Sequence, residues 1–314
     1  MSATGMHAIS KKGSLARSAL WGVALCFWFA FNVWAADIRD DEFSERSAEG
    51  TADAVSSARS TDSWVLSENL SLVETKMQFR VDNTVRVLRN DRLPQAEREV
   101  SFESSTVFYD NLVFDFVGDN GEIVVFSFNE KKFALIDPIR RMRTELGLDE
   151  IERFLSRVKP ILREKNDKFV NFMIDPSFEI SKKEDELFFQ SKFIDYHIST
   201  RGFENQQIAD AYFQFTDALG KLNVYMNPGA VTPLARIEAN KRLKESVSFP
   251  ETIVTDVYPN GKTIFNKTVH IVNESTLARR LSERDRNRVN RTIHFFAQFP
   301  MVNFQTYFEK TAER

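Results

Sequence analysis

The chain contains little cysteine, glycine or histidine, and each scarcity argues against a class of function. Its 314 residues include one cysteine, 11 glycines and four histidines. A single cysteine cannot form an intrachain disulfide or a cysteine metal site. The glycine-rich phosphate loops, the Gly-x-Ser-x-Gly nucleophile motif and the zinc-protease histidine pair are absent from the sequence. The sequence therefore identifies no catalytic residue, no cofactor and no metal ligand, and it favours a protein that is not an enzyme.

Acidic residues are abundant, so the composition does not argue against catalysis by a pair of carboxylates. Asp115, Asp119 and Glu122 flank a predicted turn, but their spacing does not fit the twelve-residue calcium loop. Asp195 and His197 would share one face of a strand, either as an acid–base pair or as a cross-strand polar pair. A secreted hydrolase that uses two carboxylates remains the less favoured alternative.

The N-terminal segment predicts export from the cytoplasm. Three basic residues, the last of them Arg17, precede an apolar run at 19–36, and small residues end that run, with Ala35 and Ala36 as the candidate cleavage position. We interpret residues 1–36 as a signal peptide or, alternatively, as a retained anchor. Because the basic residues come first, the body lies outside the membrane in both cases, in the periplasm or the extracellular space.

The chain beyond this segment is mildly acidic, and its composition changes near residue 64 from a polar segment to one with regular apolar patterns. Removing the three basic residues from a chain of formal net charge −3 leaves about −6, so a general attraction to nucleic acid is not expected. Residues 37–63 are polar and small, which predicts a disordered segment. Residues 64–308 carry the regular patterns of a single domain, with a split near residue 202 as the alternative, and residues 309–314 form a short tail.

The first half of the domain reads as strands. Residues 76–88 alternate between apolar and polar side chains, with Met77, Phe79, Val81, Val85 and Val87 on the apolar face. Further strands are predicted at 106–117, 122–128 and 133–137, and an Asn-Gly turn precedes the second of them. These four segments predict an antiparallel meander.

The second half mixes helices and strands. Helices are predicted at 149–162, 206–223, 232–246 and 282–298; the first has Asp149 as cap and a kink or break at Pro160, and the last opens with a capping box of Ser282 and Asp285. Short strands are predicted at 169–174, 178–181, 186–191 and 193–200, and a closing hairpin at 252–272 turns at Asn260-Gly261. The fold class is α+β: a large antiparallel, curved sheet, made of a meander and a C-terminal hairpin, with about four helices over one face.

Phenylalanine is the one compositional excess. The chain has 29 Phe against four Trp and six Tyr. Phe has no polar group and favours dry interiors, so these side chains form either a bulky core or an apolar cavity for a lipid, an acyl chain or a hydrophobic peptide. Candidate interior residues are Met77, Phe79, Val81, Phe114, Phe116 and Phe126.

The preferred hypothesis is an exported binding or scaffold protein of the cell envelope whose interior holds an apolar ligand. The alternative is a surface interaction module tethered by residues 1–36. The expected partners are an apolar small molecule or another envelope protein, with membrane contact only through an uncleaved N-terminal segment. If the side chains of residues 76–88 alternate as predicted, Phe79→Asp should unfold the domain, whereas Arg80→Asp should leave the thermal stability almost unchanged.

Overall fold

The computed structural model describes residues 77–88, 102–118, 121–227, 232–262 and 269–312. The proposed export segment with Ala35 and Ala36, the polar segment 37–63 and the last two residues of the predicted tail 309–314 lie outside these ranges, whereas residues 309–312 of that tail belong to a helix. Within the ranges, no helix is long and apolar enough to cross a membrane. The same ranges contain no cysteine and therefore no disulfide.

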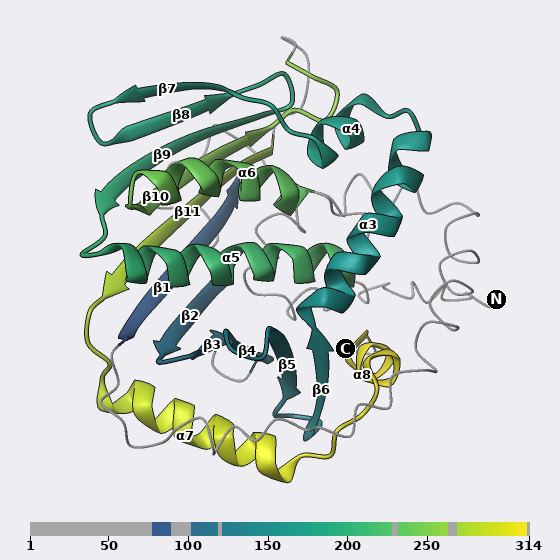
Figure 1. Ribbon diagram of the computed structural model, residues 1–314, viewed down its shortest axis with the longest axis vertical. Helices are drawn as coiled ribbons and strands as arrows, with labels where there is room; N and C mark the ends of the chain where they lie inside the picture. The colour runs from purple at the N-terminus through teal and green to yellow at the C-terminus, as the bar shows by residue number, and fades with distance from the viewer. Residues whose placement is uncertain (1–76, 89–101, 119–120, 228–231, 263–268, 313–314) are drawn as a thin grey trace, which may run out of the picture.

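One open antiparallel sheet of 11 strands organises the fold, as the sequence predicts (Figure 1). Its spatial order is β6-β5-β4-β3-β2-β1-β11-β10-β9-β8-β7. The strands are β1 (Gln78–Leu88), β2 (Phe102–Tyr109), β3 (Leu112–Val117), β4 (Ile123–Ser127), β5 (Lys132–Asp137), β6 (Met142–Gly147), β7 (Glu179–Lys183), β8 (Glu186–Gln190), β9 (Ile194–Gly202), β10 (Ser248–Val257) and β11 (Val269–Ala278). The first six form the predicted meander and the last five a second one, and the β1–β11 pair joins them.

The strand predictions need three corrections. The single strand expected at 106–117 is two strands, β2 and β3, because the chain reverses at Asp110-Asn111, where Asp110 has a φ of 56°. Strand β6 was not predicted. A hydrogen-bonded turn is found at the predicted Asn260-Gly261 position, where Gly261 donates its backbone N–H to the carbonyl of Tyr258, but the hairpin connection is longer: β10 ends at residue 257, β11 begins at residue 269, and residues 263–268 lie outside the described ranges.

Six helices are found in the described ranges: α3 (Leu148–Glu164), α4 (Lys168–Ile174), α5 (Gln206–Met226), α6 (Thr232–Glu245), α7 (Glu283–Gln298) and α8 (Phe304–Ala312). Segment 169–174, predicted as a strand, is the helix α4, whose N-cap Asp167 accepts hydrogen bonds from the backbone N–H groups of Phe169 and Val170. The break expected at Pro160 is absent, and the N-cap of α3 is Gly147 rather than Asp149. The capping box of Ser282 and Asp285 is confirmed.

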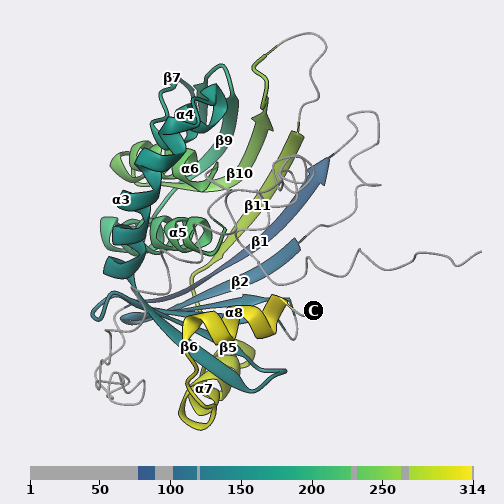
Figure 2. The same cartoon turned by 90° about the vertical axis from the view of Figure 1, so that its right-hand side faces the viewer.

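Helices lie on both faces of the sheet, which differs from the expected one-sided cover. Figure 2 shows the sheet curving around α3, α4, α5 and α6, with α7 on the opposite side. Two apolar cores result. The larger lies between the sheet and the four helices and contains Phe108, Phe126 and Phe215, whereas the smaller lies between the meander and α7 and contains Phe114, Val125 and Phe296. Because both of their faces are covered, all residues of β3 and β4 are buried.

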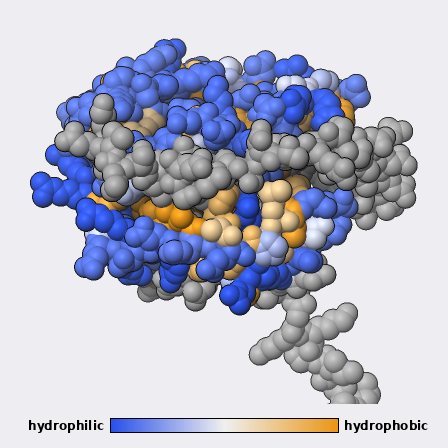
Figure 3. Space-filling view, turned by 60° about the horizontal axis from the view of Figure 1, so that its bottom comes forward, coloured by the Kyte–Doolittle hydropathy of each residue, from blue (hydrophilic) through white to orange (hydrophobic). Residues whose placement is uncertain are grey.

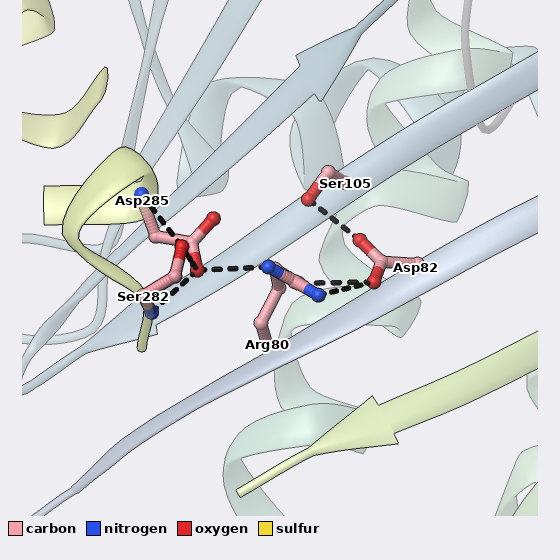
Figure 4. A network of polar contacts seen from close by, with 5 residues as sticks. All are labelled: Arg80, Asp82, Ser105, Ser282 and Asp285. Atoms are coloured by element: carbon pink, nitrogen blue, oxygen red, sulfur yellow. Dashed lines mark hydrogen bonds and ion pairs between the residues drawn. The ribbon is translucent and has the colours of Figure 1, made fainter. Parts of the chain in front are cut away.

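Helix α7 is attached to the sheet by a polar network at its N-terminus (Figure 4). A carboxylate oxygen of Asp285 accepts hydrogen bonds from Ser282 and lies 2.8 Å from Arg80 Nη1, and Arg80 also contacts Asp82 at 2.9 Å. Asp82 in turn accepts a hydrogen bond from Ser105 on β2. Arg80 is therefore part of the α7 attachment, and the expectation that Arg80→Asp is silent is wrong, because it would place an acid against the buried Asp285.

The two edges of the sheet differ. Residues 300–302 run beside β6, where Arg143 donates its backbone N–H to Pro300 and accepts from the N–H of Val302. Strand β7 pairs only with β8 among the described strands, and all five of its residues are exposed. On the side that carries α7, the surface is mostly hydrophilic and is crossed by an apolar strip (Figure 3).

Candidate functional site

A cavity of about 110 Å³ lies between the sheet and the helices α5 and α6. Strands β1, β2, β10 and β11 supply its floor, and the two helices supply its roof. Among the described residues, all of its lining belongs to the side of the sheet that faces α5 and α6, and none belongs to the core under α7. The cavity is therefore a feature of one layer of the fold.

The floor has a large apolar part because β1, β10 and β11 direct apolar side chains towards the helices. Val85, Ile253 and Ile271 line it from these strands, and Phe102 and Phe108 line it from β2. The Phe108 ring is fixed by stacking on Phe79, with centroids 4.1 Å apart. These aromatic contacts give the floor a rigid surface.

The roof comes from the predicted apolar stripe of α5 and from the start of α6. Tyr212, Phe215 and Leu219 face the cavity from α5, and the Phe215 ring meets Phe108 edge-on at 5.8 Å. Gly220 also lines the cavity, and a Cβ atom there would lie 3.5 Å from Ile237 Cδ1 of α6, an ordinary contact distance. The glycine therefore leaves space that a larger side chain would occupy.

Polar side chains interrupt the apolar floor at positions where the alternation predicts apolar ones. Asn83 lies between Val81 and Val85 on β1; it donates to Ser104 Oγ at 3.3 Å and accepts from Ser275 Oγ at 2.8 Å. Asn273 on β11 is a register partner of Val85, and its buried Oδ1 has no hydrogen-bond partner among the described residues. Buried amide oxygens in proteins are as a rule hydrogen-bonded, so this atom offers an acceptor to a donor at the cavity.

The roof carries a second group of polar side chains, which we call the roof cluster: Thr216, Asp217, Arg236 and Asn240. Asn240, which is buried, donates to Asp217 Oδ1 at 2.6 Å and accepts from Arg236 Nε at 2.9 Å. Burial raises the pKa of Asp217, and the Asn240 hydrogen bond and the charge of Arg236 oppose that rise. Burial likewise raises the pKa of Tyr212, against the charge of Arg236. Arg236 thus places positive charge at the cavity wall.

Asp115 is a buried carboxylate beside the floor, on β3 directly opposite Thr106 of β2. Thr106, which lines the cavity, donates its hydroxyl to Asp115 Oδ1 at 2.7 Å. Burial raises the pKa of Asp115 to about 6, although the Thr106 hydrogen bond and the charge of Arg288 act to lower it. Near neutral pH this carboxylate is therefore ionised at an energetic cost.

The lining suits a small molecule with an apolar body and at least one polar group. Apolar walls with a few placed polar groups are typical of ligand sites in proteins. Among the described lining residues there is no carboxylate, so the cavity lends no support to a two-carboxylate hydrolase. No group of three or more His, Cys, Asp or Glu in the described ranges could hold a metal ion.

None of the residues named from the sequence as interior candidates is among the described residues that line the cavity. Met77, Phe79, Val81 and Phe126 are buried in the larger core, and Phe114 and Phe116 are buried on the other face under α7. Sequence reasoning missed the lining itself. A usable signal was the polar residue at an inward strand position, as at Asn83 and Asn273.

Asp195 and His197 lie on one face of β9, as predicted, but they pair with different residues. Asp195 pairs with Lys262 at 2.7 Å, whereas His197 lies 3.2 Å from Glu186 and stacks on Phe188. These side chains sit on the sheet face opposite the cavity, each with its own partner. Asp119 lies outside the described residues, and Glu122 accepts a hydrogen bond from the hydroxyl of Tyr307, so the calcium arrangement gains no support.

Comparison with known proteins gives no family for this chain. No family model matches it, and no curated protein matches it at a significant level. The functional argument therefore rests on the cavity.

Proposed function

We propose that this protein is an exported, non-catalytic binding protein that holds a small, largely apolar ligand in the cavity beneath α5 and α6. The observation that supports the proposal is a space of about 110 Å³ with apolar walls and an unsatisfied amide oxygen on its floor. Apolar walls with a few placed polar groups are the usual lining of a ligand site, and this combination supports an occupant. The N-terminal pattern of residues 1–36 supports export.

The polar groups define which part of the ligand is recognised. The Oδ1 of Asn273 would accept a hydrogen bond from a ligand hydroxyl or amide. The positive charge of Arg236 favours an electron-rich group near the roof cluster. A fatty alcohol, a short acyl chain with a polar head or a similar amphipathic molecule fits this chemistry.

The test is to identify small molecules that remain bound during purification. Protein isolated under native conditions is extracted with organic solvent, and the extract is analysed by mass spectrometry. Gly220→Leu adds a side chain at the cavity wall, against the lining residues Pro233 and Ile237 of α6, and should reduce the bound molecule. Gly202→Leu is the matched control, because a Cβ at Gly202 would meet no atom within 4 Å.

The expected result is one class of amphipathic molecule in stoichiometric amount from the unchanged protein and from Gly202→Leu, and little from Gly220→Leu. The proposal is contradicted if all three proteins yield the same molecules or none. Circular dichroism of each variant verifies that the fold is retained.

A further inference from the structure

We propose that strand β7 pairs with β7 of a second copy of this chain, so that two sheets join edge to edge in a symmetric dimer. Figure 1 shows β7 as the outermost strand of its side of the sheet. It is hydrogen-bonded to β8 on one side, and none of the described strands lies on its other side. An open edge presents unpaired backbone groups, to which another extended strand can bind.

The sequence of β7 matches itself when it is reversed. Its five residues are Glu179, Ile180, Ser181, Lys182 and Lys183. An antiparallel pair with its two-fold axis at Ser181 places Glu179 opposite Lys183 of the second copy, and the symmetry repeats this contact. Opposite charges at directly facing positions stabilise an antiparallel pair. The axis at Lys182 would instead bring two lysines together, and the axis at Ile180 would pair Glu179 with Ser181, so only the axis at Ser181 brings opposite charges face to face within β7.

The side chains of β7 are available for this contact. Neither Glu179 nor Lys183 forms an ion pair with another of the described residues, although most charged residues on neighbouring strands do. Ile180 is 45% exposed, which is high for an apolar side chain, and it would face the aliphatic part of Lys182 in the second copy. At the opposite edge, the pairing of residues 300–302 with β6 occupies the equivalent positions.

A contact between two five-residue strands is small, so the dimer is expected to be weak and to depend on concentration. It would extend the sheet without using the cavity. This inference therefore stands independently of the proposed ligand.

Charge exchange tests the register. In sedimentation analysis of the full chain over a range of concentrations, Glu179→Lys or Lys183→Glu should raise the dissociation constant by roughly tenfold, because each change creates two like-charge pairs. The double variant, in which both are exchanged, should restore the dimer. Lys241→Glu on α6 changes the net charge by the same amount as Lys183→Glu and should leave the dissociation constant unchanged.

Cross-linking tests the axis. In a Cys26→Ser background, Ser181→Cys places two thiols opposite each other at the two-fold axis, within disulfide range for facing residues. Lys183→Cys lies on the same strand and face but meets Glu179, so it should cross-link much more slowly. A monomer at all concentrations, equal cross-linking of the two variants, or pairing of β7 with another segment of the chain would overturn the inference.

Discussion

The two sides of the sheet bury side chains in different ways. Under α7, inward positions carry large apolar groups such as Phe114, Val125 and Ile136, and a partly buried ion pair, Arg80–Asp285, lies at the end of the helix. Under α5 and α6, apolar positions alternate with Asn83, Thr106, Thr255 and Asn273, and a cavity remains. Both sides are rich in Phe. The number of aromatic residues therefore does not decide whether an interior is filled; the polar residues at inward positions do.

A buried carboxylate from each side, Asp285 under α7 and Asp115 on the cavity side, shows opposite effects on the pKa. Burial alone would raise the pKa of Asp285, but hydrogen bonds from Ser282 and the Arg80 guanidinium outweigh it and lower that pKa. Asp115 has a threonine hydroxyl as its hydrogen-bond partner, and burial raises its pKa to about 6. Under α7, hydrogen bonds and a cation thus stabilise the charge of Asp285. On the cavity side, the charge of Asp115 is unfavourable near neutral pH.

Replacing a Phe by Ala on each side of the sheet should give the largest difference in stability between the two sides. Phe114→Ala is expected to lower the free energy of unfolding by about 4 kcal/mol, because it leaves a void in a filled core. Phe102→Ala should cost about 2 kcal/mol, because Phe102 already borders a cavity and keeps fewer contacts. Urea unfolding measures both. Equal losses would contradict the distinction between a filled and a hollow side.

Asp115→Asn should stabilise the protein at neutral pH. Since the folded pKa is raised from 3.8 to about 6, the carboxyl favours the folded state below pH 3.8 and loses that contribution as the pH rises to about 6. At pH 8 the asparagine variant should therefore be more stable by up to about 3 kcal/mol. Thermal unfolding between pH 4 and pH 8 measures this difference, which should shrink towards pH 4. A difference that is independent of pH would show that Asp115 is not an ionised, buried group.

Arg80→Ala should weaken the attachment of α7. The Asp285 side chain is 3% exposed, and loss of its cation would leave a buried charge, so a loss of about 2 kcal/mol is expected. Because the pKa of Asp285 is lowered in the folded protein, its contribution is present above the ordinary carboxyl pKa and disappears as the pH falls through the lowered value.

Arg86→Ala is the matched control on the same strand. Arg86 pairs with Glu274, which is 41% exposed, so the expected loss is below about 1 kcal/mol. Urea unfolding at pH 7 compares the two variants. If both lose the same stability, the buried pair does not attach α7.

Much of the fold follows from local patterns in the sequence. The alternation of β1, the stripe of α5 and the capping box of α7 can be recognised because each depends on neighbouring residues. The reversal at Asp110-Asn111 was missed because strand-forming residues precede and follow it without glycine or proline. Helix α4 was missed because six mostly apolar residues fit a strand or a helix equally well, and Asp167 decides between them through its cap.

The cavity could not be predicted in the same way. Asn83 and Asn273 are 190 positions apart in the chain and reach one floor through the pairing of β1 with β11. The roof depends on the packing of α5 against α6, where Gly220 meets Ile237. The sequence contains the signal of polar residues at inward positions, but only the strand order shows that these residues face a common space.

Gly220→Ala should have the smallest effect. Alanine favours a helix over glycine by about 1 kcal/mol, and a Cβ at this position has room, so a gain of up to that amount is expected. Thermal unfolding measures it. A loss of stability would show that α5 and α6 pack more tightly at this point than the structure indicates.

Calorimetric titration with straight-chain primary alcohols of increasing length tests the central claim most directly. The unchanged protein and Gly202→Leu should bind one alcohol per chain, with an affinity that rises with length and then levels off as the cavity fills. Gly220→Leu should not bind, and Asn273→Leu should lose the preference for an alcohol over the alkane of equal length. Binding that is identical in the unchanged protein and Gly220→Leu, or no binding to either, would contradict a ligand site beneath α5 and α6.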